Sequence, residues 1–175
     1  MPLRRCLLWD IDPEAAEAFA GVAHGLEAEP VRDLRAAALQ ADVIATCTSA
    51  RRSFLDRADV RPGTFIAAVG ADSPEKNELS PRLMAGATVV ADLLAQCAAM
   101  GDLYHAIKAG LMTEGDVYSE LAQVVIGASA GRRSADEVIV FDSTGTGLQD
   151  VAAAAAAFER CRDDPKLLSI ALSQA

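Results

Sequence analysis

The stretch RPGTFIAAVGAD, residues 61–72, has the pattern of a turn, a buried strand and a polar strand end. Pro62-Gly63 is a turn signal, and the apolar run Thr64–Val69 follows it directly. An apolar run of this length, bounded by turn residues, is typical of a strand that is buried on both faces of a sheet. The small residues Gly70-Ala71 and the acid Asp72 then end the strand.

The same alternation of short apolar runs and helical stretches extends over the chain. Further strands are expected at Cys6–Trp9, Ala28–Val31, Val43–Thr46, Thr88–Ala91 and Val138–Phe141. Helices are expected from Pro13 after the cap Asp12, over Leu34–Leu39 after the cap Asp33, from Leu93 to about Val125 with breaks at Gly101, Gly110 and Gly115, and over Leu148–Arg160. This alternation predicts an α/β fold with a doubly wound parallel sheet.

The composition indicates a globular domain of ordinary size. The chain has 175 residues, of which 51% are apolar, enough to bury a core. A formal net charge of -9 argues against a nucleic-acid partner, which would require a basic face. No apolar run has the length of a signal peptide or a membrane span. We therefore expect a cytoplasmic protein that binds neither nucleic acid nor membrane, with a domain over residues 1–160 and a C-terminal tail over 161–175.

The cysteines and histidines do not indicate a metal site. Cys6, Cys47, Cys97 and Cys161 form no CxxC pair, so we expect reduced and mostly buried thiols. The only histidines are His24 and His105, and the second is expected to be a helix residue and not a base.

Polar clusters follow several of the predicted strands at the point where each strand ends. These clusters are Asp10, Thr46–Ser49, Gly70–Asp72 and Asp142–Gly147. The carboxyl ends of parallel strands share one edge, and ligands bind there in open α/β sheets. The sequence therefore predicts a binding crevice at this edge.

Asp10 has the position of the acid that binds a ribose in dinucleotide-binding folds. It ends a strand and precedes a capped helix, so its carboxylate can accept hydrogen bonds from ribose hydroxyls. Ile11 and Asp12 follow, without an arginine or lysine for a 2'-phosphate, so a nucleotide site here would favour NAD over NADP. The alternative is that Asp10 and Asp12 are only turn and cap residues.

A glycine-rich phosphate loop should precede that strand, and none is present. Gly145-Thr146-Gly147 resembles such a loop, but Asp150 stands at the third glycine position and would repel an anion. The loop can still present backbone N–H groups at a helix start.

Asp72 is the strongest single candidate for catalysis. A carboxylate at a strand end over an apolar floor can have a raised pKa and exchange protons with an amine. The alternative is that Asp72 only caps the turn at Ser73-Pro74. Lys76, which could meet a phosphate or a hydroxyl, is otherwise a solvated side chain, and Arg132-Arg133 has the pattern of a charged turn.

Several motifs together resemble the ornithine cyclodeaminase and mu-crystallin family. The resemblance runs from about Arg5 to about Arg160, and its most distinctive part is a GxDxPxKxEL-like pattern over Ala68–Leu79. The other matching segments are ADVIATCTS at 41–49, Glu120-Leu121, Gly127, Gly131-Arg132, Glu137 and FDSTG at 141–145.

The resemblance implies a role for each candidate residue. Asp72 would be the catalytic acid/base that meets the substrate amine, and Thr144 would lie close to the substrate. The cofactor NAD would be bound by Asp10, Thr46, Val69, Gly70, Ala71, Lys76 and Ser143.

The resemblance also implies a reaction on a small amino acid. In ornithine cyclodeaminase, hydride leaves the amine-bearing carbon for NAD, the side-chain amine attacks the imine, ammonia leaves, and hydride returns to give proline. Amino-acid dehydrogenases and ketimine or imine reductases belong to the same family and are the alternatives. The full-length form is expected to be a homodimer.

Two departures and one missing part qualify the resemblance. Glu75 stands where the family usually has glycine, and Thr144 replaces the more usual valine. The match covers roughly the last half of a family member, which makes the Rossmann-type domain incomplete and leaves strand edges without a neighbour. We therefore expect little activity from these residues alone, and a non-catalytic remnant is a further alternative.

Overall fold

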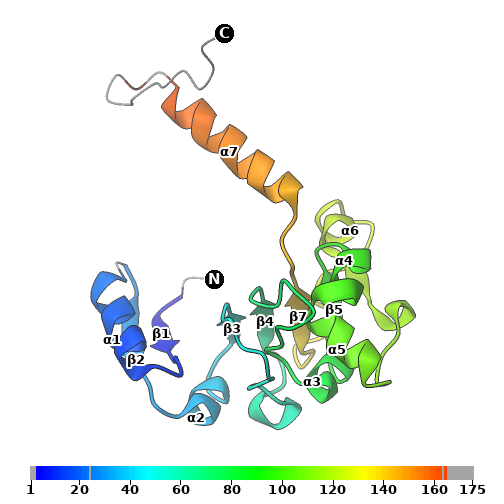
Figure 1. Ribbon diagram of the computed structural model, residues 1–175, viewed down its shortest axis with the longest axis horizontal. Helices are drawn as coiled ribbons and strands as arrows, with labels where there is room; N and C mark the ends of the chain where they lie inside the picture. Colours follow the sequence, from blue (N-terminus) through cyan, green and yellow to red (C-terminus); the bar gives the residue numbers. More distant parts are fainter. Residues whose placement is uncertain (1–2, 24, 163, 165–175) are drawn as a thin grey trace. The chain divides into compact units, whose positions relative to one another are not determined.

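The computed structural model describes residues 3–23, 25–162 and 164. Five parallel strands form the larger sheet, in the order β3-β4-β7-β5-β6 (Figure 1). Their bounds are β3 Val43–Thr46, β4 Phe65–Ala68, β7 Ile139–Asp142, β5 Thr88–Ala91 and β6 Ser119–Glu120. The strands β1 Arg5–Leu8 and β2 Glu27–Pro30 form a separate parallel pair. In the described part, β1 pairs with β2 alone and β3 with β4 alone.

Helices follow the strands, and α1, α2 and α3 begin at a side-chain cap. Their bounds are α1 Pro13–Val22, α2 Leu34–Ala38, α3 Pro81–Ala85, α4 Leu94–Met100, α5 Asp102–Lys108, α6 Leu121–Val125 and α7 Gly147–Cys161, with 3₁₀ turns at Arg57–Asp59 and Glu114–Asp116. Asp12 accepts from the Glu14 N–H at 3.0 Å, and Asp33 accepts from the Ala36 N–H at 3.0 Å. Both predicted caps are therefore confirmed.

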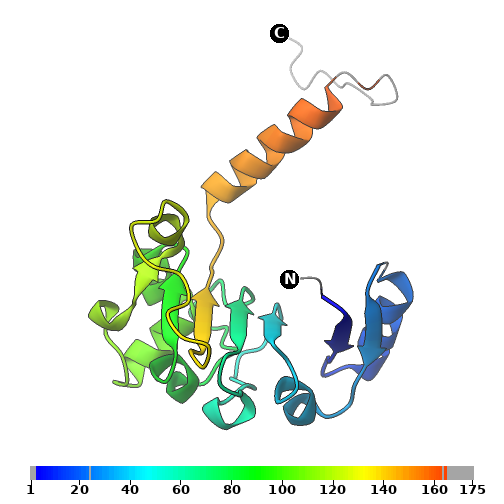
Figure 2. The same ribbon diagram turned by 180° about the vertical axis from the view of Figure 1, so that it is seen from behind.

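The core lies between the larger sheet and helices α3, α4 and α5 (Figure 2). From the strands it takes Ile66, Val89 and Val140, and from the helices it takes Leu83, Met84, Cys97, Leu103 and Ala106, all of them buried. Each large apolar side chain buried in this way contributes roughly 1.5–3 kcal/mol to folding. The interior strand β4, between β3 and β7, is the segment that the buried apolar run predicted.

The chain forms two compact units, one through Thr144 and one from Gly145 onward. The second unit contains α7, whose residues are all exposed, including Leu148, Val151 and Phe158. The Thr146 N–H donates to the Gln149 side chain at 3.2 Å at the start of this helix. The predicted tail at 161–175 lies mostly outside the described residues, so its boundary at 160 stays a prediction.

The α/β fold with a parallel sheet is confirmed, and two local expectations are wrong. The stretch from Leu93 to Val125 is not continuous helix between its glycines, because the two-residue strand β6 lies within it. This strand is too short and polar to show a period of two. The thiols are not mostly buried either: Cys97 is buried, Cys6 is partly exposed, and Cys47 and Cys161 are exposed. All four thiols are free, as expected.

Gly101 is packed too closely to accept a side chain. A Cβ atom there would lie 2.7 Å from Oδ2 and 2.9 Å from Oδ1 of Asp142, whose side chain is fully buried. We predict that Gly101→Ala lowers the free energy of unfolding by about 1–3 kcal/mol, the usual cost of overpacking. Urea denaturation measures the change.

Gly21 provides the control for this prediction. It lies in α1 with nothing within 4 Å of a built Cβ, so Gly21→Ala should be neutral or stabilising by about 0.5–1 kcal/mol. Equal effects of the two substitutions would contradict the proposed clash at Gly101.

Candidate functional site

The register of the larger sheet brings several predicted site residues to one edge. Thr46 is paired with Ala68, and Ala68 with Asp142, so the three strands end at the same level. The backbone pairing continues past the strands: Val69 N–H donates to Thr46 O at 2.9 Å, and Ser143 N–H donates to Ala68 O at 2.9 Å. The loops after β3, β4 and β7 are therefore neighbours, as the crevice prediction requires.

Two hydroxyl oxygens at this edge are buried without a hydrogen-bond partner. They are Oγ1 of Thr46, the last residue of β3, and Oγ1 of Thr144, which follows β7. Buried polar atoms in folded proteins almost always have a partner, so each exception needs an explanation. A hydroxyl at the carboxyl edge of a parallel sheet can supply or accept a hydrogen bond to a ligand.

The turn after β4 is built from small residues packed against a buried acid. The Gly70 N–H donates to Oε2 of Glu78 at 3.0 Å, and Ala71 is fully buried. A Cβ on Gly70 would come within 2.6 Å of the Thr48 backbone nitrogen and would also clash with the Glu78 carboxylate. Glycine is therefore required here by space. Val69 is 44% exposed at the same edge.

Asp72 forms an ion pair with Lys76 at 2.6 Å, and its side chain is 53% exposed. The hydrogen bond from Lys76 lowers the pKa of Asp72 and outweighs desolvation, which acts in the opposite direction. The shift is therefore opposite to the raised pKa that a carboxylate at a strand end can have. Lys76 is therefore not only a solvated side chain, because it pairs with the carboxylate four residues before it.

Asp92, which the sequence reading missed, joins the loops after β5 and β7. Its Oδ2 accepts from the Ser143 hydroxyl at 2.9 Å and from the Thr144 N–H at 2.9 Å. Its Oδ1 accepts from the Leu93 N–H at 2.6 Å. Asp92 follows the strand β5 directly, so the rule that selected Asp10 and Asp72 could also have selected it.

Asp102 and Asp142 form a fully buried pair of acids, at the start of α5 and at the end of β7. Asp142 accepts from the Asp102 N–H at 3.3 Å and from the Leu103 N–H at 2.9 Å, at the start of α5. Burial raises the pKa of Asp102 to about 6, and burial together with the charge of Asp102 raises the pKa of Asp142 to about 7. Asp142 was expected only as part of a loop, and Asp102 had no sequence signal.

Asp10 does not belong to the edge formed by the loops after β3, β4 and β7. It follows β1, which pairs with β2 in the separate two-stranded sheet. Its Oδ1 accepts from the Asp12 N–H at 2.8 Å, which is the turn role that was the alternative reading. Ile11, beside it, is 89% exposed. Both readings of Asp10 are compatible with this position.

His105 does not act on the candidate acid. It lies in α5, and its Nε2 is 2.8 Å from the backbone oxygen of Lys76. This contact supports the segment that carries Lys76 and agrees with the expectation of a helix residue. Among the residues that the structure describes, no three His, Cys, Asp or Glu side chains gather in a way that could hold a metal ion.

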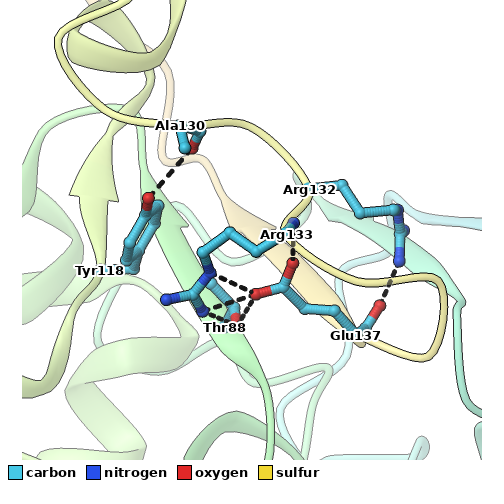
Figure 3. A network of polar contacts seen from close by, with 6 residues as sticks. All are labelled: Thr88, Tyr118, Ala130, Arg132, Arg133 and Glu137. Carbon is cyan, nitrogen blue, oxygen red and sulfur yellow. Dashed lines mark hydrogen bonds and ion pairs between the residues drawn. The ribbon is translucent and has the colours of Figure 1, made fainter.

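A separate polar network lies where β5 and β7 begin, at the other end of these strands (Figure 3). Glu137 accepts from Thr88 at 2.8 Å and from Nε of Arg133 at 2.9 Å, and the bonds from Arg133 lower its pKa to about 2. The Arg133 guanidinium lies 4.3 Å from the centre of the Tyr118 ring, and the Tyr118 hydroxyl donates to Ala130 O at 3.1 Å. The predicted charged turn at Arg132-Arg133 therefore anchors its loop to the sheet, through Glu137 and Thr88 of β5.

The sequence pattern of the ornithine cyclodeaminase/mu-crystallin family matches residues 1–164. The chain belongs to this family. The resemblance stated from the motifs is thereby confirmed. In the described residues, no helix has both the length and the apolar character to cross a membrane.

Three relatives from this family catalyse two kinds of reaction, imine reduction and cyclodeamination, according to their names. The iminosuccinate reductase of Paracoccus denitrificans is 42% identical over 86% of this chain and 47% of its own length. Its structure in complex with NAD+ has a TM-score of 0.85 and 39% identity over 93% of this chain and 50% of that one. The Δ1-pyrroline-2-carboxylate reductase of Thermococcus litoralis, in complex with NADH and L-proline, has a TM-score of 0.89 and 27% identity over 95% and 53% of the two chains.

The third relative is a lysine cyclodeaminase, with a TM-score of 0.83 and 32% identity over 99% of this chain and 50% of that one. The chain thus spans about half the length of the curated relatives that it matches. Reductases and a cyclodeaminase share this fold, so the fold alone does not select the reaction.

The buried acid Asp102 makes stability depend on pH in a defined direction. Because its pKa is raised to about 6, the folded state holds this proton more tightly than the unfolded chain. The stabilisation is complete below about pH 4 and is lost as the pH rises to about 6, with a magnitude of up to about 3 kcal/mol. We predict that Asp102→Asn flattens this fall, as measured by urea denaturation between about pH 4.5 and 7.5.

Asn suits this test because the Asp102 Oδ2 has no partner, while Oδ1 accepts from the Asn77 amide and from the N–H groups of Glu78 and Leu79. The exposed Asp136→Asn is the control and should keep the wild-type pH dependence. An Asp102→Asn protein with the full wild-type fall in stability would refute the assignment.

Lys76 sets the protonation of Asp72. We predict that Lys76→Gln raises the pKa of Asp72 toward its ordinary value, because the largest cause of the lowering is removed. Carboxyl ¹³C chemical shifts followed by NMR during a pH titration measure this change. Lys108→Gln, which removes the lysine over the Tyr104 ring, should leave the Asp72 titration unchanged. An unchanged titration in Lys76→Gln would show that the ion pair does not form in solution.

Proposed function

We propose that this chain supplies the NAD-binding side of an enzyme that moves a hydride to or from the nitrogen-bearing carbon of a small amino or imino acid. The observation that carries the proposal is the convergence of Thr46, the Gly70–Asp72 turn and Ser143-Thr144 at one edge of the sheet. Relatives with NAD+ or NADH bound support the choice of cofactor.

The residues at this edge fit a dinucleotide. The hydroxyl oxygens of Thr46 and Thr144 are buried and have no partner, so a ligand can use them without breaking an existing bond. Gly70 lets the turn after β4 pack directly against Glu78 and the Thr48 backbone. Asp10, after β1 of the separate strand pair, is followed by Ile11 and Asp12 and by no arginine or lysine for a 2'-phosphate, which favours NAD over NADP.

The proposed roles follow from the side-chain chemistry. When bound, NAD supplies reversible hydride transfer. Asp72 holds or accepts the proton of the substrate amine, and Lys76 holds a cofactor hydroxyl or keeps Asp72 charged. Val69, Gly70, Ala71 and Ser143 line the cofactor, and the Thr144 hydroxyl contacts the substrate. The arrangement of the Asp72–Lys76 pair supports this division, since both groups lie at one turn.

Imino-acid reduction and cyclodeamination are the two candidate reactions. Relatives named as reductases at up to 42% identity support the first, and the lysine cyclodeaminase at 32% identity supports the second. Net NADH consumption with an imino acid, or its formation with an amino acid, identifies a reductase or dehydrogenase. Conversion of ornithine to proline with ammonia release and no net NADH change identifies a cyclodeaminase. The same assays test the expectation of little activity from this chain alone. The homodimer and the cytoplasmic location also stay predictions.

The first test of the proposal measures NADH binding to the purified chain by calorimetry, with NADPH as the comparison. We expect binding that favours NADH. We further predict that Asp10→Ala weakens NADH binding by roughly 10- to 150-fold, the loss of about 1.5–3 kcal/mol from hydrogen bonds to a charged group. Asp136→Ala is the exposed control. Failure of the wild-type chain to bind either nucleotide would overturn the proposal for this chain.

A further inference from the structure

Glu78 is a fully buried acid with no described ion pair to a lysine or arginine. Its Oε1 accepts from the Thr48 N–H at 2.6 Å and from the Thr48 hydroxyl at 2.7 Å. Its Oε2 accepts from the Gly70 N–H at 3.0 Å. The carboxylate therefore connects the loop after β3, which follows Thr46, with the loop after β4, which carries Asp72.

The backbone of Glu78 is fixed from two further sides. Its N–H donates to Oδ1 of Asp102 at 2.8 Å, which also accepts from the Leu79 N–H at 3.1 Å. Its carbonyl oxygen accepts from the Phe54 N–H at 3.0 Å. The Glu78 side chain thus has a fixed base, and its position determines where the two loops can lie.

Stability alone does not account for an acid at this position. A buried carboxylate without a cation costs free energy, and an apolar residue of similar size is often as stable. A carboxylate with two oxygens can, however, accept from two separate loops at once. Its three bonds go only to Thr48 and Gly70, which flank the candidate site.

We propose that Glu78 is a positioning residue for the cofactor site: it holds the Thr46–Thr48 and Gly70–Asp72 turns at the separation that a bound dinucleotide requires. The inference rests on the proposed function. In Glu78→Gln, an amide NH₂ must face one of the N–H groups, because the side chain keeps only one acceptor oxygen. The two loops would then separate, while the site residues themselves stay unchanged.

The test compares NADH affinity and fold in matched variants of the full 175-residue chain. We expect Glu78→Gln to weaken NADH binding by about tenfold or more, the usual effect of losing a hydrogen bond to a charged group. Glu114→Gln, an exposed glutamate on a distant 3₁₀ turn, should bind as the wild type does. Circular dichroism establishes that each variant is folded.

A milder pair of variants tests the same contact if Glu78→Gln does not fold. Thr48→Val removes the hydroxyl, with its bond to Glu78 and the bond that it accepts from the Ala50 N–H, and Thr48→Ser keeps both. We expect Thr48→Val to weaken NADH binding several-fold and to shift the Gly70 amide proton in NMR spectra, and Thr48→Ser to do neither. A merely structural role would lower the melting temperature without a change in NADH affinity at a temperature where the variant is folded.

The outcomes separate this inference from the proposed function. Wild-type affinity in folded Glu78→Gln or Thr48→Val overturns the positioning role and leaves the proposed function standing. A wild-type chain without NADH binding overturns the proposed function, and the positioning role with it. Weakened binding in Glu78→Gln and Thr48→Val, with unchanged binding in Glu114→Gln and Thr48→Ser, establishes the positioning role.

Discussion

The structure depends on backbone N–H groups that donate to three fully buried carboxylates, those of Asp142, Asp102 and Glu78. Asp142, at the end of β7, accepts from the first turn of α5, and Asp102 in that turn accepts from the backbone of residues 78 and 79. Glu78 then accepts from the loops after β3 and β4. One series of hydrogen bonds therefore runs from the centre of the sheet through a helix to the loops that carry the candidate site. Each acid offsets its own burial by satisfying N–H groups that would otherwise be buried without a partner.

These acids also explain why glycine stands at two positions of the chain. Gly101 and Gly70 both face carboxylates, of Asp142 and Glu78, at distances that leave no room for a Cβ atom. Neither glycine has a positive φ, so neither is required by backbone conformation. Close approach of the backbone to a buried charge is the reason in both cases. The glycine in the GxDxPxKxEL-like pattern is thus linked to the glutamate of the same pattern by direct contact, eight residues apart.

The sequence was sufficient for the sheet and for part of the site. The strands β4, β5 and β7 are buried or half-buried along their length, and β3 is partly exposed at the sheet edge, but all four appear as continuous apolar runs. Asp12 and Asp33 cap the two helices that the sequence predicts after them. The meeting of the loops after β3, β4 and β7 at one sheet edge followed from the parallel topology alone. Glu78 and Asp102 could not be found in this way, because most of their contacts join segments 24 to 40 residues apart. Asp72 was interpreted from its strand and its neighbouring turn, which do not show that Lys76 comes within 2.6 Å.

The Asp72–Lys76 pair restricts how Asp72 can take part in proton transfer. With Lys76 in place, the pKa of Asp72 is lowered, so the carboxylate is a weak base toward an amine. A role in proton exchange under the proposed function therefore requires that Lys76 turn to another acceptor, such as a hydroxyl of the bound cofactor. Loss of that cation would raise the pKa of Asp72, and the exclusion of water by a ligand would raise it further. Binding of the cofactor would then convert Asp72 from a partner of Lys76 into a base for the substrate amine. This order of events connects the two roles that the family resemblance assigns to neighbouring residues of a single turn.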